Sequence, residues 1–387
     1  MYPGISDLIN DFFGTHFTAS FPPSFGTLVA LSFLLAAYTL GSELKRKEKM
    51  GFLKPFVQKE IIGLPASAAE FFWNGVYGFL IGFKIFFILF NHVEFLDNPQ
   101  KIILSLKGNL AGGLLLGALF VFLKYREKNK TKLKVPEVSD KLVYPHQLVS
   151  EITMASALGG LLGAKIFHLL EYWSDFTADP IGMFFSGSGL TMYGGLIVGA
   201  IVVLWYGKKN NIPPLELCDS NAPGLMLAYG TGRLGCQLAG DGDWGIVNNI
   251  PKPSFLNFLP DWIWTYRYPN NVINEGIPIE NCTGHHCYQL AESVFPTPLY
   301  ESIVCIGLFF VLWSMRKRII IPGVLFSWYL LFNGIERFLI EQIRINSKYH
   351  LAGIDFSQAQ LISFLLILTG IFGIFYFRRN VKTHEGL

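Results

Sequence analysis

The sequence has few charged residues. Asp, Glu, Lys and Arg make up 15% of its 387 residues, whereas hydrophobic residues make up 51%. Soluble domains carry about 25% charged residues, so this composition excludes a soluble globular domain and indicates an integral membrane protein. The sequence also lacks a phosphate-binding P-loop, a nucleophile elbow and a dinucleotide fingerprint. We therefore expect no cofactor and no nucleic-acid partner.

Basic residues are absent from the first 18 positions, so the basic segment of a cleavable signal peptide is missing. We expect the first apolar run to be a retained helix. Cysteines are also few, and two of the five, Cys282 and Cys287, lie in one polar loop with His285 and His286. These four side chains are too close in sequence to converge easily on one tetrahedral zinc ion, so we expect no metal site. A disulfide between the two cysteines stays open.

Nine apolar segments approach the roughly 20 residues that a membrane-spanning helix needs. They are residues 25–41, 71–91, 103–123, 148–170, 190–207, 217–239, 298–315, 320–341 and 358–377. The sequence therefore predicts an all-α polytopic membrane protein with about nine transmembrane helices. The connection 240–297 is rich in tryptophan, which favours a small ordered cap at the membrane surface over a disordered linker.

Lysine and arginine are concentrated in alternate connections between these segments. The basic set occupies residues 45–59, 124–141, 208–209, 316–318 and 378–382. Because basic connections face the cytoplasm, we expect the N-terminus outside and the C-terminus inside. This orientation places the connection 240–297 on the extracytoplasmic side.

Charge and glycine interrupt the end of the segment 217–239. The run from Gly232 to Gly245 contains Arg233, Asp241, Asp243 and five glycines. A charge at membrane depth is costly and marks a functional site. The planar guanidinium of arginine matches phosphate oxygens, and the carboxylates would act as a base or orient the arginine. The alternative is an interfacial salt bridge that closes the helix end.

A second arginine lies at the same expected membrane level. Arg337 and Glu341 are four residues apart and share one helix face. An ion pair within the helix explains this spacing, but two arginines at one level favour a shared anion site.

Two further motifs open predicted helices. Tyr193, Gly194 and Gly195 offer a hydroxyl and bare backbone N–H groups to a head group, although small residues also serve helix packing. Pro298-Leu299-Tyr300-Glu301 has the proline and acid that normally begin a helix.

Together these motifs resemble those of the prolipoprotein diacylglyceryl transferase family. Gly232-Arg233-Leu234-Gly235 with Trp244-Gly245 is similar to the family signature, and the other three motifs follow the family's order over residues 151–345. The resemblance implies an enzyme of the bacterial inner membrane. Such enzymes transfer the diacylglyceryl group of phosphatidylglycerol to the lipobox cysteine of a prolipoprotein signal peptide and release glycerol phosphate. The partners would be these two substrates and membrane lipids.

The resemblance also implies roles for individual residues. The catalytic set would be Arg233, Arg337, Tyr193, Asp241, Asp243 and Glu341. The substrate-binding set would be Arg233, Gly194, Gly195, Gly245, Tyr300 and Glu301.

The sequence departs from the family pattern at Tyr193, where histidine is common, and at Cys236, where asparagine is common. A tyrosine hydroxyl is a poor base at neutral pH, so the base stays open. Residues 51–137 resemble an inserted helical hairpin, which suggests an N-terminal region 1–147 and a transferase-like core 148–387. Two alternatives remain: a non-catalytic lipid- or lipoprotein-binding protein of the same fold, and a secondary transporter of an anionic solute, against which stands the lack of an inverted repeat.

Overall fold

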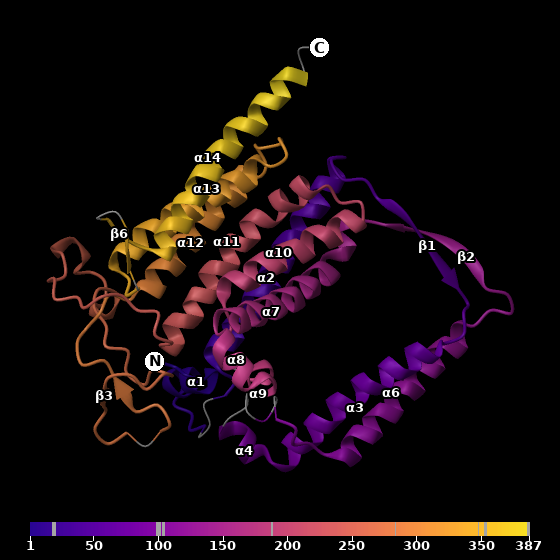
Figure 1. Cartoon of the computed structure of the whole chain (residues 1–387), viewed down its shortest axis with the longest axis horizontal. Coiled ribbons are helices and arrows are strands. Elements are labelled where there is room, and N and C mark those ends of the chain that lie inside the picture. The colour runs from indigo at the N-terminus through magenta and orange to yellow at the C-terminus, as the bar shows by residue number, and fades with distance from the viewer. Residues whose placement is uncertain are drawn as a thin grey trace. The chain divides into compact units, whose positions relative to one another are not determined.

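The computed structural model of the protein describes residues 1–17, 21–97, 102, 105–186, 189–282, 284–346, 348–351 and 354–384. These residues form two compact units. The first comprises Met1–Phe52 and Gly207–Leu387, and the second Leu53–Tyr206. Both are mainly helical (Figure 1). Each unit is described by itself.

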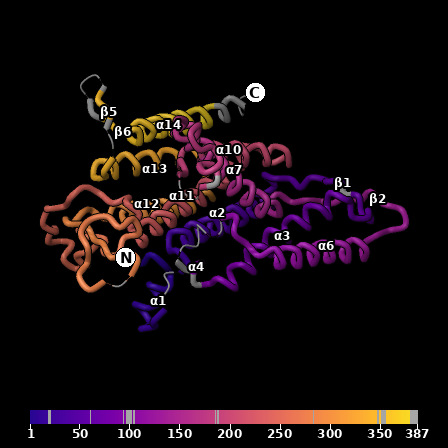
Figure 2. The backbone as a smooth tube through the Cα atoms, turned by 60° about the horizontal axis from the view of Figure 1, so that its bottom comes forward, coloured from indigo at the N-terminus to yellow at the C-terminus, as the bar shows by residue number. Residues whose placement is uncertain are grey.

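The first unit is built on a long central helix, α11 (Pro214–Ala239), which packs most extensively against α2 and α12. Its other helices are α1 (Ile5–Phe13), α2 (Ser24–Lys49), α12 (Thr297–Met315), α13 (Val324–Ile340) and α14 (Gln358–His384). Helices α13 and α14 lie side by side in both views (Figures 1 and 2). Ala222 and Met226 of α11 form the apolar core with Cys305 and Leu312 of α12.

The second unit contains two pairs of long helices. Its elements are β1 (Phe56–Ile62), α3 (Ala68–Phe90), α4 (His92–Asp97), α6 (Leu110–Thr131), β2 (Glu137–Val143), η1 (Pro145–Leu148), α7 (Val149–Glu171), α8 (Trp173–Ala178), α9 (Pro180–Phe185) and most of α10 (Met192–Lys209), whose last three residues are counted with the first unit. Glycines bring the α3 and α6 backbones into contact. A Cβ on Gly82 would lie 2.2 Å from the carbonyl oxygen of Gly112, so no larger residue fits there.

Each of the nine predicted segments contains a helix in the described part of the chain. Five helices there are long and apolar enough to cross a membrane. They are Ser24–Lys49, Ala68–Phe90, Pro145–Glu171, Thr297–Met315 and Gln358–Arg379. The expectation of a mainly helical polytopic membrane protein is therefore supported, whereas nine crossings remain a prediction. The division at residue 147 also stays a prediction.

Two helices begin later than the predicted segments. In the segment 103–123, residues 103 and 104 lie outside the described residues and residues 105–109 are not helical. Helix α6 begins at Leu110, where Asn109 caps it by accepting a hydrogen bond from the Gly112 N–H at 2.8 Å. The Lys84 ammonium donates a hydrogen bond to the Lys107 carbonyl at 2.9 Å, in the non-helical residues 105–109 that precede α6. The helix expected from residue 320 begins at Val324, because the Asp219 carboxylate accepts the N–H of Gly323 at 2.8 Å and caps the helix there.

The all-α expectation was incomplete, since the described part of the chain contains three two-stranded antiparallel ladders. They are β1–β2, β3–β4 (Ile277–Pro278 with Tyr288–Gln289) and β5–β6 (Lys348–Leu351 with Ile354–Ser357). The longest pairs Phe56 with Val143 and Ile62 with Glu137 and leads to the α3–α6 hairpin (Figure 1). Its strands are separated in sequence by that hairpin, so the pattern of either strand alone could not show the pairing.

The described residues of the connection 240–297, here called the cap, contain a small core of their own, while a position at the membrane surface stays a prediction. Trp244, Tyr268, Leu290 and Val294 form this core. Two short turns, η2 (Ser254–Leu256) and η3 (Asp261–Ile263), and the ladder β3–β4 complete it. Cys282 and Cys287 form a disulfide, which resolves the open question of their pairing. The Tyr268 hydroxyl donates to Gln237 at 2.7 Å and ties this cap to α11.

Candidate active site

Arg233 lies near the C-terminal end of α11 and is only 8% exposed. The helix ends at Gly240, whose left-handed backbone (φ +65°) suits glycine and turns the chain back over the helix end. This turn brings Asp243 against the guanidinium, and the two side chains form an ion pair. The ion pair agrees with a carboxylate that orients the arginine and equally with a salt bridge that closes the helix end, so the role of the pair stays a prediction.

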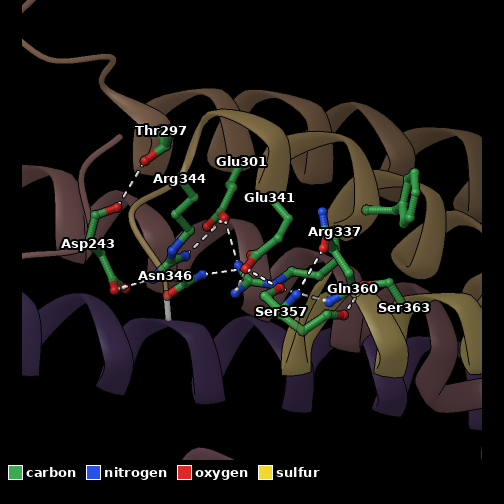
Figure 3. A network of polar contacts seen from close by, with 12 residues as sticks. Asp243, Thr297, Glu301, Arg337, Glu341, Arg344, Asn346, Ser357, Gln360 and Ser363 are labelled. Atoms are coloured by element: carbon green, nitrogen blue, oxygen red, sulfur yellow. Dashed lines mark hydrogen bonds and ion pairs between the residues drawn. The ribbon is translucent and has the colours of Figure 1, made fainter. Parts of the chain in front are cut away.

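Glu301 is the centre of the site. Its side chain is completely buried and pairs with three arginines. Oε2 contacts Nε of Arg233. Oε1 accepts hydrogen bonds from Arg337 at 3.0 Å and from Arg344 at 3.2 Å, and Figure 3 shows these two contacts. An isolated carboxylate is costly to bury, whereas one surrounded by cations is stabilised. Through these ion pairs Glu301 connects the start of α12 to the end of α11, to the end of α13 and to the segment that contains Arg344.

Asp243 is a second bridge between the arginines. One carboxylate oxygen contacts Arg233 and the other contacts Arg344. The Asp243 carbonyl accepts the Thr297 hydroxyl at 2.9 Å, which anchors it to the start of α12 (Figure 3). Burial raises the pKa of Asp243, but Arg233 and Arg344 outweigh burial and hold that pKa below its ordinary value. This carboxylate is therefore ionised at neutral pH.

Arg337 and Glu341 form the ion pair that their spacing predicted, at 3.2 Å. Glu341 also accepts the hydroxyl of Ser357 at 2.6 Å and the side-chain amide of Asn346 at 2.5 Å (Figure 3). These contacts tie the end of α13 to the start of α14. The ion pair that the spacing predicted is therefore present, and Arg337 also contacts Glu301; a shared anion site stays a prediction.

Arg344 belongs to the site, although sequence reasoning assigned it no role. A signal was present in the sequence, since Arg337, Glu341 and Arg344 are spaced by four and three residues, although Arg344 itself lies in extended backbone after the helical turn η4 (Glu341–Ile343). Gly245 allows Arg344 to approach, because the two form a backbone bridge and a Cβ on Gly245 would lie 2.5 Å from the Ile343 carbonyl oxygen. The conformational reason for glycine at 245 is therefore close backbone approach.

Asp241 lies beside the arginine network. Its Oδ1 is buried and has no hydrogen-bond partner among the described residues. Burial, together with the neighbouring Asp243, raises the pKa of Asp241 above its ordinary value. Cys236, Asp241 and Asp243 present donor atoms within 4.8 Å of one another, but both oxygens of Asp243 already contact arginines. We therefore assign no metal to this cluster.

The raised pKa of Asp241 predicts a pH-dependent stability. The folded protein binds a proton that the unfolded chain, with a pKa of about 3.9, has already released. The stability that this bound proton contributes is fully present below about pH 3.9 and is lost as the pH rises through the pKa of Asp241 in the folded protein. Asp241→Asn removes the cost of burying a charged carboxylate. It should therefore raise the melting temperature in detergent at pH 7–8, by roughly 2–4 °C for each kcal/mol of that cost. The difference should vanish near pH 4. An equal shift at both pH values would contradict this, and the exposed Glu292→Gln serves as control.

The remaining predicted site residues have mainly structural contacts. The Tyr300 hydroxyl donates to the Ile263 carbonyl at 2.7 Å and connects α12 to the cap. Tyr193, Gly194 and Gly195 lie on α10 in the second unit. A Cβ on Gly194 would lie 2.5 Å from the Gly163 carbonyl oxygen of α7, so this glycine permits close packing of α7 and α10. Their predicted contact with a head group stays a prediction.

Comparison with known proteins identifies the family. A family model described as prolipoprotein diacylglyceryl transferase matches residues 137–376. This chain belongs to the prolipoprotein diacylglyceryl transferase family. It is a transferase by that membership, and the matched range contains every arginine of the network.

Individual relatives agree with this family. All three proteins compared below are named phosphatidylglycerol–prolipoprotein diacylglyceryl transferase. The protein of Lactococcus lactis subsp. cremoris is 31% identical over 269 residues, covering 68% of this chain and 87% of that protein. That of Streptococcus agalactiae is 30% identical over 251 residues, covering 64% and 86%. That of Leptospira interrogans is 27% identical over 341 residues, covering 75% and 92%.

Proposed function

We propose that this protein transfers the diacylglyceryl group of phosphatidylglycerol to the lipobox cysteine thiol of prolipoproteins and releases glycerol phosphate. The observation that carries the proposal is the buried network in which Arg233, Arg337 and Arg344 meet around Glu301. It lies in a chain that belongs to the transferase family and resembles relatives named for this reaction. Neither a transporter nor a non-catalytic lipid-binding protein is favoured by these relatives.

The chemistry requires stabilisation of negative charge. The substrate thiolate attacks the glyceryl carbon, a carbon–sulfur bond forms, and the carbon–oxygen bond to phosphate breaks. Charge then builds up on the departing phosphate, where guanidinium groups stabilise it through paired N–H donors. In this proposal Arg233 and Arg337 bind the phosphate. Asp243 and Glu341 orient these two arginines through the ion pairs described above.

Asp241 would contribute to orienting the network. The family resemblance further assigns Tyr193, Gly194 and Gly195 of the second unit to contact with the head group or the thiol. Gly245, Tyr300 and Glu301 would shape the substrate site through the backbone and cap contacts already described. Apolar surfaces between helices would admit the lipid chains from the membrane.

A direct assay tests the function. Purified protein in vesicles of phosphatidylglycerol is mixed with a peptide that carries a lipobox cysteine, and the diacylglyceryl-modified peptide is measured by mass spectrometry. We expect product with this lipid and none when serine replaces the peptide cysteine. Failure to form product, together with failure to complement a transferase-depleted strain, would favour the non-catalytic alternative.

We also propose the inner membrane as the location, with nine crossings, the N-terminus outside and the C-terminus in the cytoplasm. The basic connections support this orientation, and a disulfide in the cap suits an oxidising compartment. A cysteine introduced at exposed Glu292 of the cap should react in intact spheroplasts with a membrane-impermeant thiol reagent. A cysteine at exposed Lys209 should react only after the membrane is opened. The reverse pattern would overturn the orientation.

A further inference from the structure

Glu336 is a buried acid that the roles above leave unused. It lies on α13, one residue before Arg337, and is 6% exposed. Neither of its carboxylate oxygens has a hydrogen-bond partner among the described residues. A buried polar group without a partner costs free energy. The burial of Glu336 beside several charged side chains is more simply explained by a role in the reaction than by a contribution to the stability of the fold.

The charges of the network explain why this acid differs from its neighbours. Asp243, Glu301 and Glu341 each form ion pairs with one or more of the three arginines. Glu336 interacts electrostatically with Glu301 and with the same arginines, but it forms no ion pair with them in the described structure. The three guanidinium groups are thus already matched by three other carboxylates. Asp241 has one buried oxygen without a hydrogen-bond partner, whereas Glu336 has two, so among the described acids of this cluster Glu336 has both oxygens without such a partner.

The reaction needs such a group. A thiol has a reference pKa of about 8.5 and must lose its proton to attack. Tyr193, which occupies the position of the family's common histidine, has a hydroxyl that is a poor base at neutral pH. Asp243 and Glu341 are neutralised by arginine contacts. A carboxylate that receives no hydrogen bonds is a better proton acceptor than one that does.

We infer that Glu336 is the catalytic base that takes the proton from the lipobox cysteine thiol. This inference rests on the proposed function. The proton passes from sulfur to a Glu336 oxygen, and the thiolate forms its bond to the glyceryl carbon. The electron pair of the broken carbon–oxygen bond leaves on the phosphate. Glu336 then passes its proton to the departing glycerol phosphate and returns to the carboxylate form.

The groups that face Glu336 come from three helices and one loop. They are Tyr229 and Arg233 of α11, Glu301 and Cys305 of α12, Arg337 of α13, and Arg344. Helix α14, which packs on α13, has no titratable side chain between Leu361 and Thr369. Glu301 is the other carboxylate among these groups, and arginines contact both of its oxygens. A change in the pH dependence of the transfer rate on substitution of Glu336 is therefore assigned to the Glu336 carboxyl group.

The test compares wild type with Glu336→Gln, which preserves shape and removes the base. Transfer to a lipobox peptide from phosphatidylglycerol vesicles is measured from pH 6 to 9. At pH 7 we expect Glu336→Gln to lower kcat about 100-fold or more, with activity recovering toward wild type as the pH passes about 8.5 and the free thiol ionises. A peptide with selenocysteine, whose selenol ionises at lower pH, should restore much of the rate at pH 7.

Controls separate this inference from the proposed function. Wild-type transfer shows that the function holds, and Glu292→Gln controls for the loss of an acid at an exposed position. Wild-type rates for Glu336→Gln over the whole pH range would overturn the inference while the function stands. An equal loss with both peptides at every pH would also overturn it, because that pattern indicates a structural role.

Discussion

Arg233→Ala is expected to abolish diacylglyceryl transfer, with kcat reduced by about 100-fold to 1,000-fold or more. Arg233 lies on α11 and contacts both Asp243 and Glu301. Its loss removes the donors proposed to stabilise the departing phosphate. The protein should still fold, since Glu301 and Asp243 keep their contacts with Arg344. The rate in the phosphatidylglycerol assay, together with thermal unfolding in detergent, checks both parts.

Two further variants sharpen this result. Arg233→Lys keeps the charge but loses the planar pair of donors, so it should recover only a small part of the activity. Arg267→Ala removes an exposed arginine from the cap and should leave the rate unchanged. Wild-type activity in Arg233→Ala would refute the proposed role of this side chain. A loss that only tracks unfolding would assign Arg233 to stability.

Glu301→Ala should cause the largest loss of stability among single substitutions in the site. Its side chain is completely buried and contacts Arg233, Arg337 and Arg344 at once. Removing one partner from a buried ion pair costs about 3–5 kcal/mol, because the other charge is left uncompensated. Here three cations lose a shared partner. We expect a strongly lowered melting temperature in detergent, or loss of the folded protein on extraction.

The conservative variant Glu301→Gln distinguishes charge from shape. It fills the same space and still accepts a hydrogen bond, so a loss nearly as large as that of Glu301→Ala would show that the negative charge is what matters. Glu292→Gln in the exposed part of the cap should have little effect. An unchanged melting temperature for Glu301→Ala would contradict the central role of this carboxylate.

Much of the fold could be predicted because membrane helices follow from local composition. A long apolar run must satisfy its own backbone in lipid, so it forms a helix wherever it occurs. The exceptions are instructive. The helix starts at Leu110 and Val324 depend on Asn109 and Asp219 as caps, and Asp219 lies far from Val324 in sequence. The ladder β1–β2 likewise joins strands on either side of a hairpin.

The sequence by itself determined the membrane class, the helices and the arginines of two family motifs, because these depend on composition and on spacing within one helix. Arg233 with Asp243, and Arg337 with Glu341, were close enough in sequence to be paired in advance. Only the tertiary structure brought α11, α12 and the end of α13 together around Glu301. It alone recruited Arg344 and left Glu336 buried without a partner. Long-range ion pairs and burial arise from packing, and no local pattern encodes which charges will meet.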